Sequence, residues 1–248
     1  RKVDFSIGDA SILKDINIDA KPGSTVAIMG ITGAGKSSFI NLIGRYYDCT
    51  SGGIYFDGVN VKNMDMFLLR KNTAVVMQDV FLFSDTIEEN IKFGLELSSD
   101  DPVFTSAVKD SMVDEFVFQM NEGYKTVIGE RGIGLSGGQK QRISIARALV
   151  RDAKVLILDD STSALDMETE YEIQKALNKR KGITKFIIAH RISAVKNADE
   201  ILYFENGSII ERGTHEKLLA LRGRYYKTYC AQYSDYAEEF IKEVSNAG

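Results

Sequence analysis

The sequence predicts an α/β fold: a parallel sheet covered by helices, a small antiparallel β subdomain near the N-terminus, and an inserted α-helical subdomain. After about residue 148, strand-like and helical segments alternate, at Lys154–Leu158, Glu168–Lys179, Lys185–Ile188 and Ile201–Phe204. Such alternation is typical of parallel strands joined by covering helices. From about Ser84 to Arg147 the apolar spacing is helical instead, which indicates an insertion within one core.

We therefore expect four regions, at 1–83, 84–147, 148–232 and 233–248. The first holds strand-like alternation at Val3–Phe5 and Ile16–Ile18, then the apolar run Thr25–Met29, which reads as a buried strand. The second starts near Thr86, a plausible helix cap, and continues through a helical stretch at 100–120. The third completes the core, and the fourth is expected to be a helical tail. The tyrosines near the end are predicted to pack against the core: Tyr225, Tyr226, Tyr229, Tyr233 and Tyr236.

Composition narrows the class of protein. The chain has 248 residues, of which 44% are hydrophobic and 27% charged, with a net charge of −4. These values are typical of a globular protein, and without a basic stripe no nucleic-acid partner is expected. Its apolar runs are far shorter than the roughly 20 residues of a spanning helix, so we expect no membrane span, and no signal peptide is apparent. Cys49 and Cys230 lack CxxC spacing and are expected to be plain thiols.

A phosphate-binding motif follows the buried strand. Residues Gly30–Ser37 read GITGAGKS and match GxxxxGK[ST] between that strand and an apolar helix. The glycines let consecutive N–H groups and the helix N-terminus face phosphates, Lys36 supplies a positive charge, and Ser37 can ligate magnesium. Asp159 ends the apolar strand from Lys154, so it is expected beside the phosphates, holding magnesium through water. Together these motifs predict a P-loop NTPase core.

A second motif separates the classes of P-loop NTPase. Leu135–Gln139 reads LSGGQ, about twenty residues before the Asp159 strand. With the P-loop, it resembles the signature of the ABC ATPase family, and the resemblance extends from Val3 to about Gln232. Its serine hydroxyl and glycine N–H groups at a helix start form a second anion site. In the family, that site completes the ATP site of a second domain, so two domains sandwich two ATP molecules head to tail.

The resemblance implies roles for individual residues. Gln78, Asp160 and His190 match catalytic positions, and Ser163–Asp166 resembles the D-loop. Magnesium would be held by Ser37, Gln78 and Asp159. ATP contacts are implied at Ile7, Ile12, Thr32, Gly33, Ala34, Gly35, Lys36, Ser37 and Ser38, with Ser136, Gly137, Gly138 and Gln139 facing the partner's nucleotide. His215 is expected to be a surface or helix-start residue.

The segment Thr126–Gly132, just before the signature, resembles the one with which exporters of this family contact their membrane domains. Importers generally lack it, so the resemblance favours an exporter. The implied partners are transmembrane domains and a second, non-identical nucleotide-binding domain. The implied location is the cytoplasmic face of the cell membrane.

Two positions depart from the family pattern. Asp160 stands where active members carry a glutamate that polarises the attacking water. A displacement of about 1 Å can lower a rate on the order of 10²-fold, so hydrolysis at this chain's own P-loop is expected to be slow. Ile7 stands where an aromatic residue usually stacks on adenine, and Phe5 is expected to point to the core.

Three functions stay open at this stage. The first is an ATPase that drives export and has one weak site within a heterodimer. The second is a binding module in which ATP at this site clamps a dimer with little hydrolysis. The third is a non-transport ABC-type ATPase, as in DNA repair or translation; those proteins need long coiled coils or tandem domains, which the sequence lacks. The transported substrate is not readable, because it would contact the membrane domains.

Overall fold

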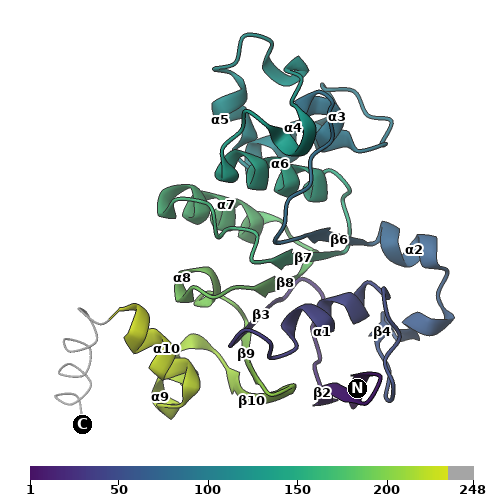
Figure 1. Ribbon diagram of the computed structural model, residues 1–248, viewed down its shortest axis with the longest axis vertical. Coiled ribbons are helices and arrows are strands. Elements are labelled where there is room, and N and C mark those ends of the chain that lie inside the picture. The colour runs from purple at the N-terminus through teal and green to yellow at the C-terminus, as the bar shows by residue number, and fades with distance from the viewer. Residues whose placement is uncertain (234–248) are drawn as a thin grey trace.

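The computed structural model describes residues 1–233. Its central sheet has the strand order β10-β9-β3-β8-β7-β6, in which β9 to β6 run parallel and β10 pairs antiparallel with β9. The helices flank this sheet along its length (Figure 1). The strands of the sheet are β3 (Thr25–Gly30), β6 (Thr73–Val76), β7 (Val155–Asp159), β8 (Thr184–Ile188), β9 (Glu200–Glu205) and β10 (Ser208–Gly213). The predicted α/β fold with a parallel sheet is confirmed.

The antiparallel β subdomain consists of two short hairpins near the N-terminus. Strands β1 (Val3–Ile7) and β2 (Ala10–Ile16) form one, and β4 (Tyr55–Phe56) and β5 (Val59–Asn60) form the other. The expected strand at Ile16–Ile18 is wrong in its bounds, because pairing begins at the tight turn after Ile7 and β2 ends at Ile16. Asn17 leaves the ladder, and its side chain accepts the Lys2 N–H at 2.7 Å.

Alternation along the strands separates two hydrophobic cores. On β7, Leu156 and Leu158 pack with the helical subdomain, whereas Val155 and Ile157 pack with β3 and the helix α1 (Lys36–Ile43). Successive strand residues point to opposite faces, so a strand buried on both faces reads as a continuous apolar run. This explains why the VLILD segment carried no polar alternation.

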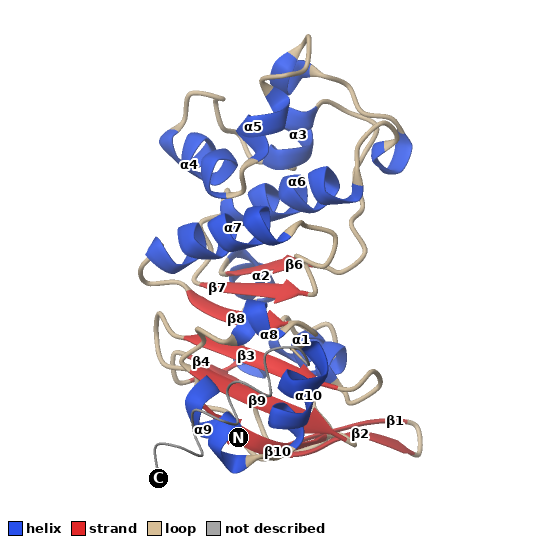
Figure 2. Ribbon diagram, turned by 90° about the vertical axis from the view of Figure 1, so that its left-hand side faces the viewer, coloured by secondary structure: helices blue, strands red, loops and turns tan. Residues whose placement is uncertain are grey.

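The inserted helical subdomain lies at one end of the molecule, above β6 and β7 in Figures 1 and 2. Thr86 caps its first helix by accepting the Glu89 N–H at 3.1 Å. The helical stretch expected at 100–120 is two helices, because Met112 adopts a left-handed φ of 58° between them. The helices of this region are α3 (Ile87–Lys92), α4 (Pro102–Asp110), α5 (Val113–Val117) and α6 (Gly137–Leu149), with 3₁₀ turns η2 (Gly123–Lys125) and η3 (Glu130–Gly132).

The C-terminal helices cover the other end of the sheet. Tyr225 is fully buried, and Tyr226, Tyr229 and Tyr233 pack against the same cluster, so the packing interpretation of these tyrosines is confirmed. Tyr236 and most of the expected 233–248 tail lie outside the described residues. The remaining helices are α2 (Met66–Lys71), α7 (Met167–Lys179), α8 (Ile192–Val195), α9 (His215–Leu221) and α10 (Arg224–Gln232), with the 3₁₀ turn η1 (Val61–Asn63). Within residues 1–233, no helix is long and apolar enough to cross a bilayer.

Candidate ATP-binding site

The P-loop joins the end of β3 to the start of α1, and its glycines are required by close contacts. Gly30 has a φ of 141°, and a Cβ there would lie 2.2 Å from the carbonyl oxygen of Phe204 on β9. Gly35, at the N-cap of α1, has a φ of 97°, and its Cβ would lie 2.7 Å from Leu13 Cδ2. Both positions combine a backbone that L-residues rarely adopt with no room for a side chain. The loop is thereby fixed against both β9 and β2.

Lys36 is the first residue of α1 and is buried beneath the loop. Its Nζ donates to the carbonyl oxygens of Gly30 at 2.8 Å and Ile31 at 2.9 Å. Burial lowers the pKa of Lys36, while the negative charges of Asp159 and Asp160 oppose this shift. The ammonium group is thus held between the phosphate loop and two carboxylates.

Asp159 ends β7 and lies next to the start of α1. Burial raises its pKa, and the charge of Asp160 raises it further, whereas Lys36, a hydrogen bond from the Ser37 hydroxyl and His190 lower it. Parallel pairing places Asp159 opposite Ile188 of β8, two residues before His190. The carboxyl ends of three neighbouring strands therefore bring Lys36, Ser37, Asp159 and His190 to one edge of the sheet.

The other catalytic candidates lie along the same edge. Asp160 has a left-handed φ of 45° and donates its N–H to the Ile188 carbonyl oxygen at 2.9 Å. Asp adopts this conformation more readily than most residues. Gln78 follows β6, two residues past the strand end, and is exposed, as is His190. These side chains can reach a nucleotide seated on the P-loop without first leaving a buried position.

The arrangement of oxygens fits a magnesium ion. Ser37 and Asp159 share a hydrogen bond, so their two oxygens already converge. A hydroxyl with one or two carboxylates, completed by water and phosphate, is the ligand set that Mg²⁺ prefers in nucleotide sites. The repulsion between Asp159 and Asp160 is also the kind that a bound cation relieves.

The candidate adenine contacts lie on the β1–β2 hairpin. Ile7 ends β1 and its side chain is 58% exposed. Ile12 lies on β2, and its carbonyl oxygen would be 3.1 Å from a Cβ on Gly35, so this part of β2 touches the P-loop. Phe5 is buried, as expected. The end of β1 thus presents an exposed aliphatic side chain at the position where the sequence comparison with the family expected an aromatic one.

The signature residues occupy a different part of the molecule. Ser136 caps α6, accepting the Gln139 N–H at 3.2 Å, while the Ser136 N–H donates to Gln139 Oε1 at 2.9 Å. This reciprocal pair is a capping box. In Figures 1 and 2, α6 lies beyond β6, β7 and β8 from α1. The structure therefore gathers the P-loop residues with Asp159, Asp160 and His190, and leaves Ser136, Gly137, Gly138 and Gln139 apart from them.

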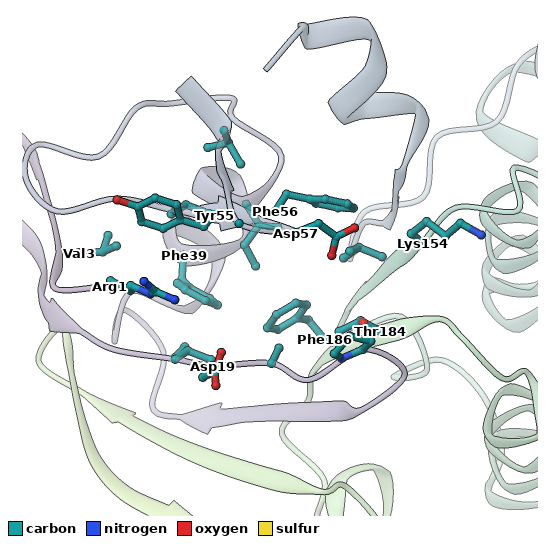
Figure 3. A pocket seen from close by; sticks show the side chains of 18 of the residues that line it. Arg1, Val3, Asp19, Phe39, Tyr55, Phe56, Asp57, Lys154, Thr184 and Phe186 are labelled. Atoms are coloured by element: carbon teal, nitrogen blue, oxygen red, sulfur yellow. The ribbon is translucent and has the colours of Figure 1, made fainter. Parts of the chain in front are cut away.

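One cavity lies away from the candidate nucleotide site. It measures about 570 Å³ and lies where β7 and β8 begin, beside Lys154 and Thr184, at the sheet edge opposite the P-loop (Figure 3). Phe39 and Phe186 form part of its wall. Because parallel α/β sheets present ligands at the carboxyl ends of their strands, this cavity lies on the wrong edge for the phosphates.

Sequence reasoning missed several residues that brace the loops around the site. Arg191 contacts Ser163 and Glu170, and Gln232 bonds the main chain on both sides of Arg191, accepting from Ile192 N at 2.9 Å and donating to the His190 carbonyl oxygen at 2.6 Å. In the sequence, only the position of Arg191 next to His190 could have indicated a role for this arginine. His215 begins α9 as expected, yet its Nδ1 lies 2.7 Å from the Tyr225 hydroxyl, so it is not a free surface residue.

The fold and the P-loop define a nucleotide-hydrolysing domain of the P-loop class. The family model described as ABC transporter matches residues 13–163, more than half of the chain. The chain belongs to the ABC transporter family, and it is an ATP-binding ATPase domain of that family.

Similar proteins are considerably longer. The chain is 43% identical over 236 residues to the ATP-dependent lipid A-core flippase of Syntrophus aciditrophicus (strain SB), covering 95% of this chain and 39% of that protein. It is 47% identical over 229 residues to a Staphylococcus aureus (strain NCTC 8325 / PS 47) protein provisionally named a multidrug export ATP-binding/permease protein, covering 92% and 39%. The structure of a bacterial Atm1-family ABC exporter with ATP bound superposes with a TM-score of 0.90 at 37% identity, covering 94% of this chain and 41% of that one. The chain thus spans about two fifths of these proteins.

Proposed function

We propose that this chain is the motor domain of an ABC exporter, binding MgATP between its own P-loop and the signature of a second domain. One observation carries the proposal. Lys36, Asp159, Asp160 and His190 lie at one edge of the sheet, whereas α6, which begins with the signature, lies across β6, β7 and β8 from the P-loop helix α1 (Figures 1 and 2). We therefore infer that a nucleotide held by both kinds of group binds between two chains, arranged head to tail.

Each residue then has a defined task. The N–H groups from Thr32 to Ser38 and the Lys36 ammonium hold the β- and γ-phosphates. Mg²⁺, held by Ser37, Asp159 and Gln78, would neutralise charge that develops on the phosphate oxygens. Asp160 orients the attacking water, and His190, on the neighbouring strand end, donates toward the γ-phosphate. The signature would bind the nucleotide on the partner's P-loop, through Ser136, Gly137, Gly138 and Gln139.

We further propose that the two sites of the assembled protein are unequal. Asp160 keeps the carboxylate of the general base but is one methylene shorter than the family's glutamate. The N–H bond from Asp160 to the Ile188 carbonyl oxygen opposes a forward shift of its backbone that could compensate. A non-identical partner that carries the longer side chain would perform most of the hydrolysis.

Export is the transport direction that the similar proteins support. Two of them carry export or exporter in their names, one is a flippase, and all are long enough to include further domains. The segment Thr126–Gly132 is available for a membrane domain, since Val127 is 67% exposed. The domain would then act at the cytoplasmic face of the cell membrane.

A second function is favoured by Asp160 alone. If the shortened carboxylate does not activate water, ATP at this site would act as a clamp that holds the dimer closed without being hydrolysed. The full-length protein in membrane vesicles distinguishes the two functions. We expect ATP-dependent accumulation of a transported dye and hydrolysis at both sites, with this one slower. Nucleotide that stays trapped and unhydrolysed at this P-loop through many turnovers would favour the clamp, and absence of ATP-driven transport would contradict the exporter proposal.

A further inference from the structure

The residue after the candidate switch histidine makes an unusual set of contacts. Arg191 Nη2 donates to the Ser163 carbonyl oxygen at 2.5 Å, and Nη1 donates to Glu170 Oε2 at 3.2 Å and to the Leu165 carbonyl oxygen at 3.5 Å. Its guanidinium thus bridges two backbone carbonyls and a carboxylate. A planar fork of donors can make such contacts at once, which a lysine ammonium cannot.

The partner carboxylate is buried. Glu170, on α7, has only 4% of its side chain exposed, and its second oxygen accepts the Thr162 hydroxyl at 2.6 Å. A buried charge needs both an opposite charge and hydrogen bonds, and here Arg191 and Thr162 supply them. Loop 162–165 is therefore tied to α7 at one end and to Arg191 along its length.

The other face of this loop supports the signature. Gln141, buried on α6, accepts the Ala164 N–H at 3.0 Å and donates to Ser163 Oγ at 3.2 Å. A Cβ on Gly137 would lie 3.3 Å from Ala164 Cβ, and one on Gly138 would lie 3.2 Å from the Ala164 carbonyl oxygen. The turn Ser136–Gly138 thus rests directly on loop 162–165.

We propose that Arg191 is a positioning residue that holds loop 162–165 against the signature turn, so that the signature and the segment bearing His190 move as one unit. This inference rests on the proposed function, because it assumes that Ser136 acts on the partner's nucleotide. Its consequence is that a residue outside the P-loop, next to this chain's own phosphate site, sets hydrolysis at the other site.

The test uses the full-length transporter and separates geometry from charge. Replacing Arg191 alone would strand the buried Glu170 carboxylate, so the informative variant is Arg191→Met with Glu170→Gln, which removes both charges. The matched control on α7 is Lys175→Met with Glu172→Gln, which removes an exposed ion pair. We expect the first pair to lower kcat about tenfold or more, as misplaced catalytic groups do, with the ATP dissociation constant and Tm close to wild type. The control pair should change none of these.

Arg191→Lys and Ser136→Ala complete the design. Arg191→Lys keeps the charge beside Glu170 but not the fork, so its kcat should also fall. If Arg191 acts through the signature, a variant that combines the Arg191 change with Ser136→Ala should lose less kcat than the product of the two separate fold losses. Wild-type kcat in Arg191→Lys, or in the variant Arg191→Met with Glu170→Gln, would overturn the inference. It would also be overturned if the two separate losses of kcat multiply in the combined variant. Unchanged turnover in Ser136→Ala would instead overturn the proposed function, whatever Arg191 does.

Discussion

At the scale of single residues, the length of one side chain decides how this site is expected to work. Asp160 lies beside Asp159 and within the field of Lys36, so its charge is where a general base should be. We propose that reach is what it lacks, because its side chain is one methylene shorter than that of a glutamate. On this proposal, geometry rather than charge limits catalysis at this P-loop.

Lys36→Ala should remove most MgATP binding by this chain. The variant loses the charge facing the β- and γ-phosphates, so we expect affinity to fall tenfold or more, by analogy with other charge-assisted contacts. Isothermal titration calorimetry measures this affinity for MgATP. Lys154→Ala is the matched control, since this exposed lysine lies at the opposite sheet edge and should bind ATP normally. Equal affinities in the two variants would contradict the P-loop assignment.

Asp160→Asn and Ser136→Ala should have unequal effects in the assembled transporter. If the two sites are unequal as proposed, Asp160→Asn removes the slower base and total kcat should fall only modestly, whereas Ser136→Ala would disturb the partner's site and should lower kcat much more. Each tenfold loss corresponds to about 1.4 kcal/mol of transition-state stabilisation. Steady-state kcat at saturating MgATP is the measurement.

Two checks accompany that comparison. Ser136 also caps α6, and losing an N-cap costs about 1 kcal/mol of stability, so Tm must be measured for both variants. Asp160→Glu should raise turnover at this site. Turnover eliminated equally by Asp160→Asn and Ser136→Ala would mean that both sites are competent.

Ile7→Tyr should tighten ATP binding. Ile7 is 58% exposed on the hairpin whose second strand contacts the P-loop, so a tyrosine there would have room to stack on a base as proposed, and stacking contributes roughly 1–3 kcal/mol in nucleic-acid complexes. We expect at least a fivefold gain in ATP affinity, measured by calorimetry. Ile210→Tyr, at another exposed apolar position, serves as the control. No gain would place the base elsewhere.

At the scale of elements, the sequence predicts a segment correctly where the pattern of neighbouring residues alone determines its structure. Gly30–Ser37 could be placed because its spacing, the preceding apolar run and the following helix all agree. Strand β2 was misplaced because most of its residues are exposed and its pairing is set by a turn at Gly8 and Asp9. The contacts of Arg191 with Glu170 and of Gln141 with Ser163 join residues 21 and 22 positions apart. Such contacts depend on packing between elements, which no local pattern records.

Gly30→Ala should destabilise the fold strongly. Its Cβ would meet the Phe204 carbonyl oxygen of β9, which the sheet holds in place, while φ stays at 141°. Strained backbone alone costs about 1–3 kcal/mol, and the clash adds to this. The control is Gly94→Ala. Gly94 has a φ of 80°, but a Cβ there would meet no atom within 4 Å, so this variant measures the cost of backbone strain without a clash. Thermal unfolding should show a clearly larger loss of Tm for Gly30→Ala, and equal losses would contradict the β3–β9 contact.

At the scale of the whole molecule, we propose that the P-loop edge of the sheet and the start of α6 are each one half of an ATP site. Two cores lie on opposite faces of β7, and the helical subdomain also packs against β6, α7 and loop 162–165. The helical subdomain is thus joined to the nucleotide core through several elements.

The isolated domain should be monomeric and slow to hydrolyse ATP. If each complete site needs a signature from a second chain, as proposed, turnover per chain should rise with protein concentration in the presence of MgATP. Light scattering and ATPase assays over a concentration series measure both quantities. Rapid turnover by a monomer, independent of concentration, would contradict the two-chain site.

The capping box on α6 has one more consequence, which concerns the direction of hydrogen bonds. The Ser136 oxygen already accepts from Gln139, and the Ser136 N–H already donates to the glutamine side chain. What the serine still offers outward is its hydroxyl hydrogen, alongside the N–H groups of the glycines. The turn therefore presents mainly donors, with one lone pair of the serine oxygen still able to accept. It would favour an acceptor of suitable shape, charged or neutral, over an ammonium or a guanidinium.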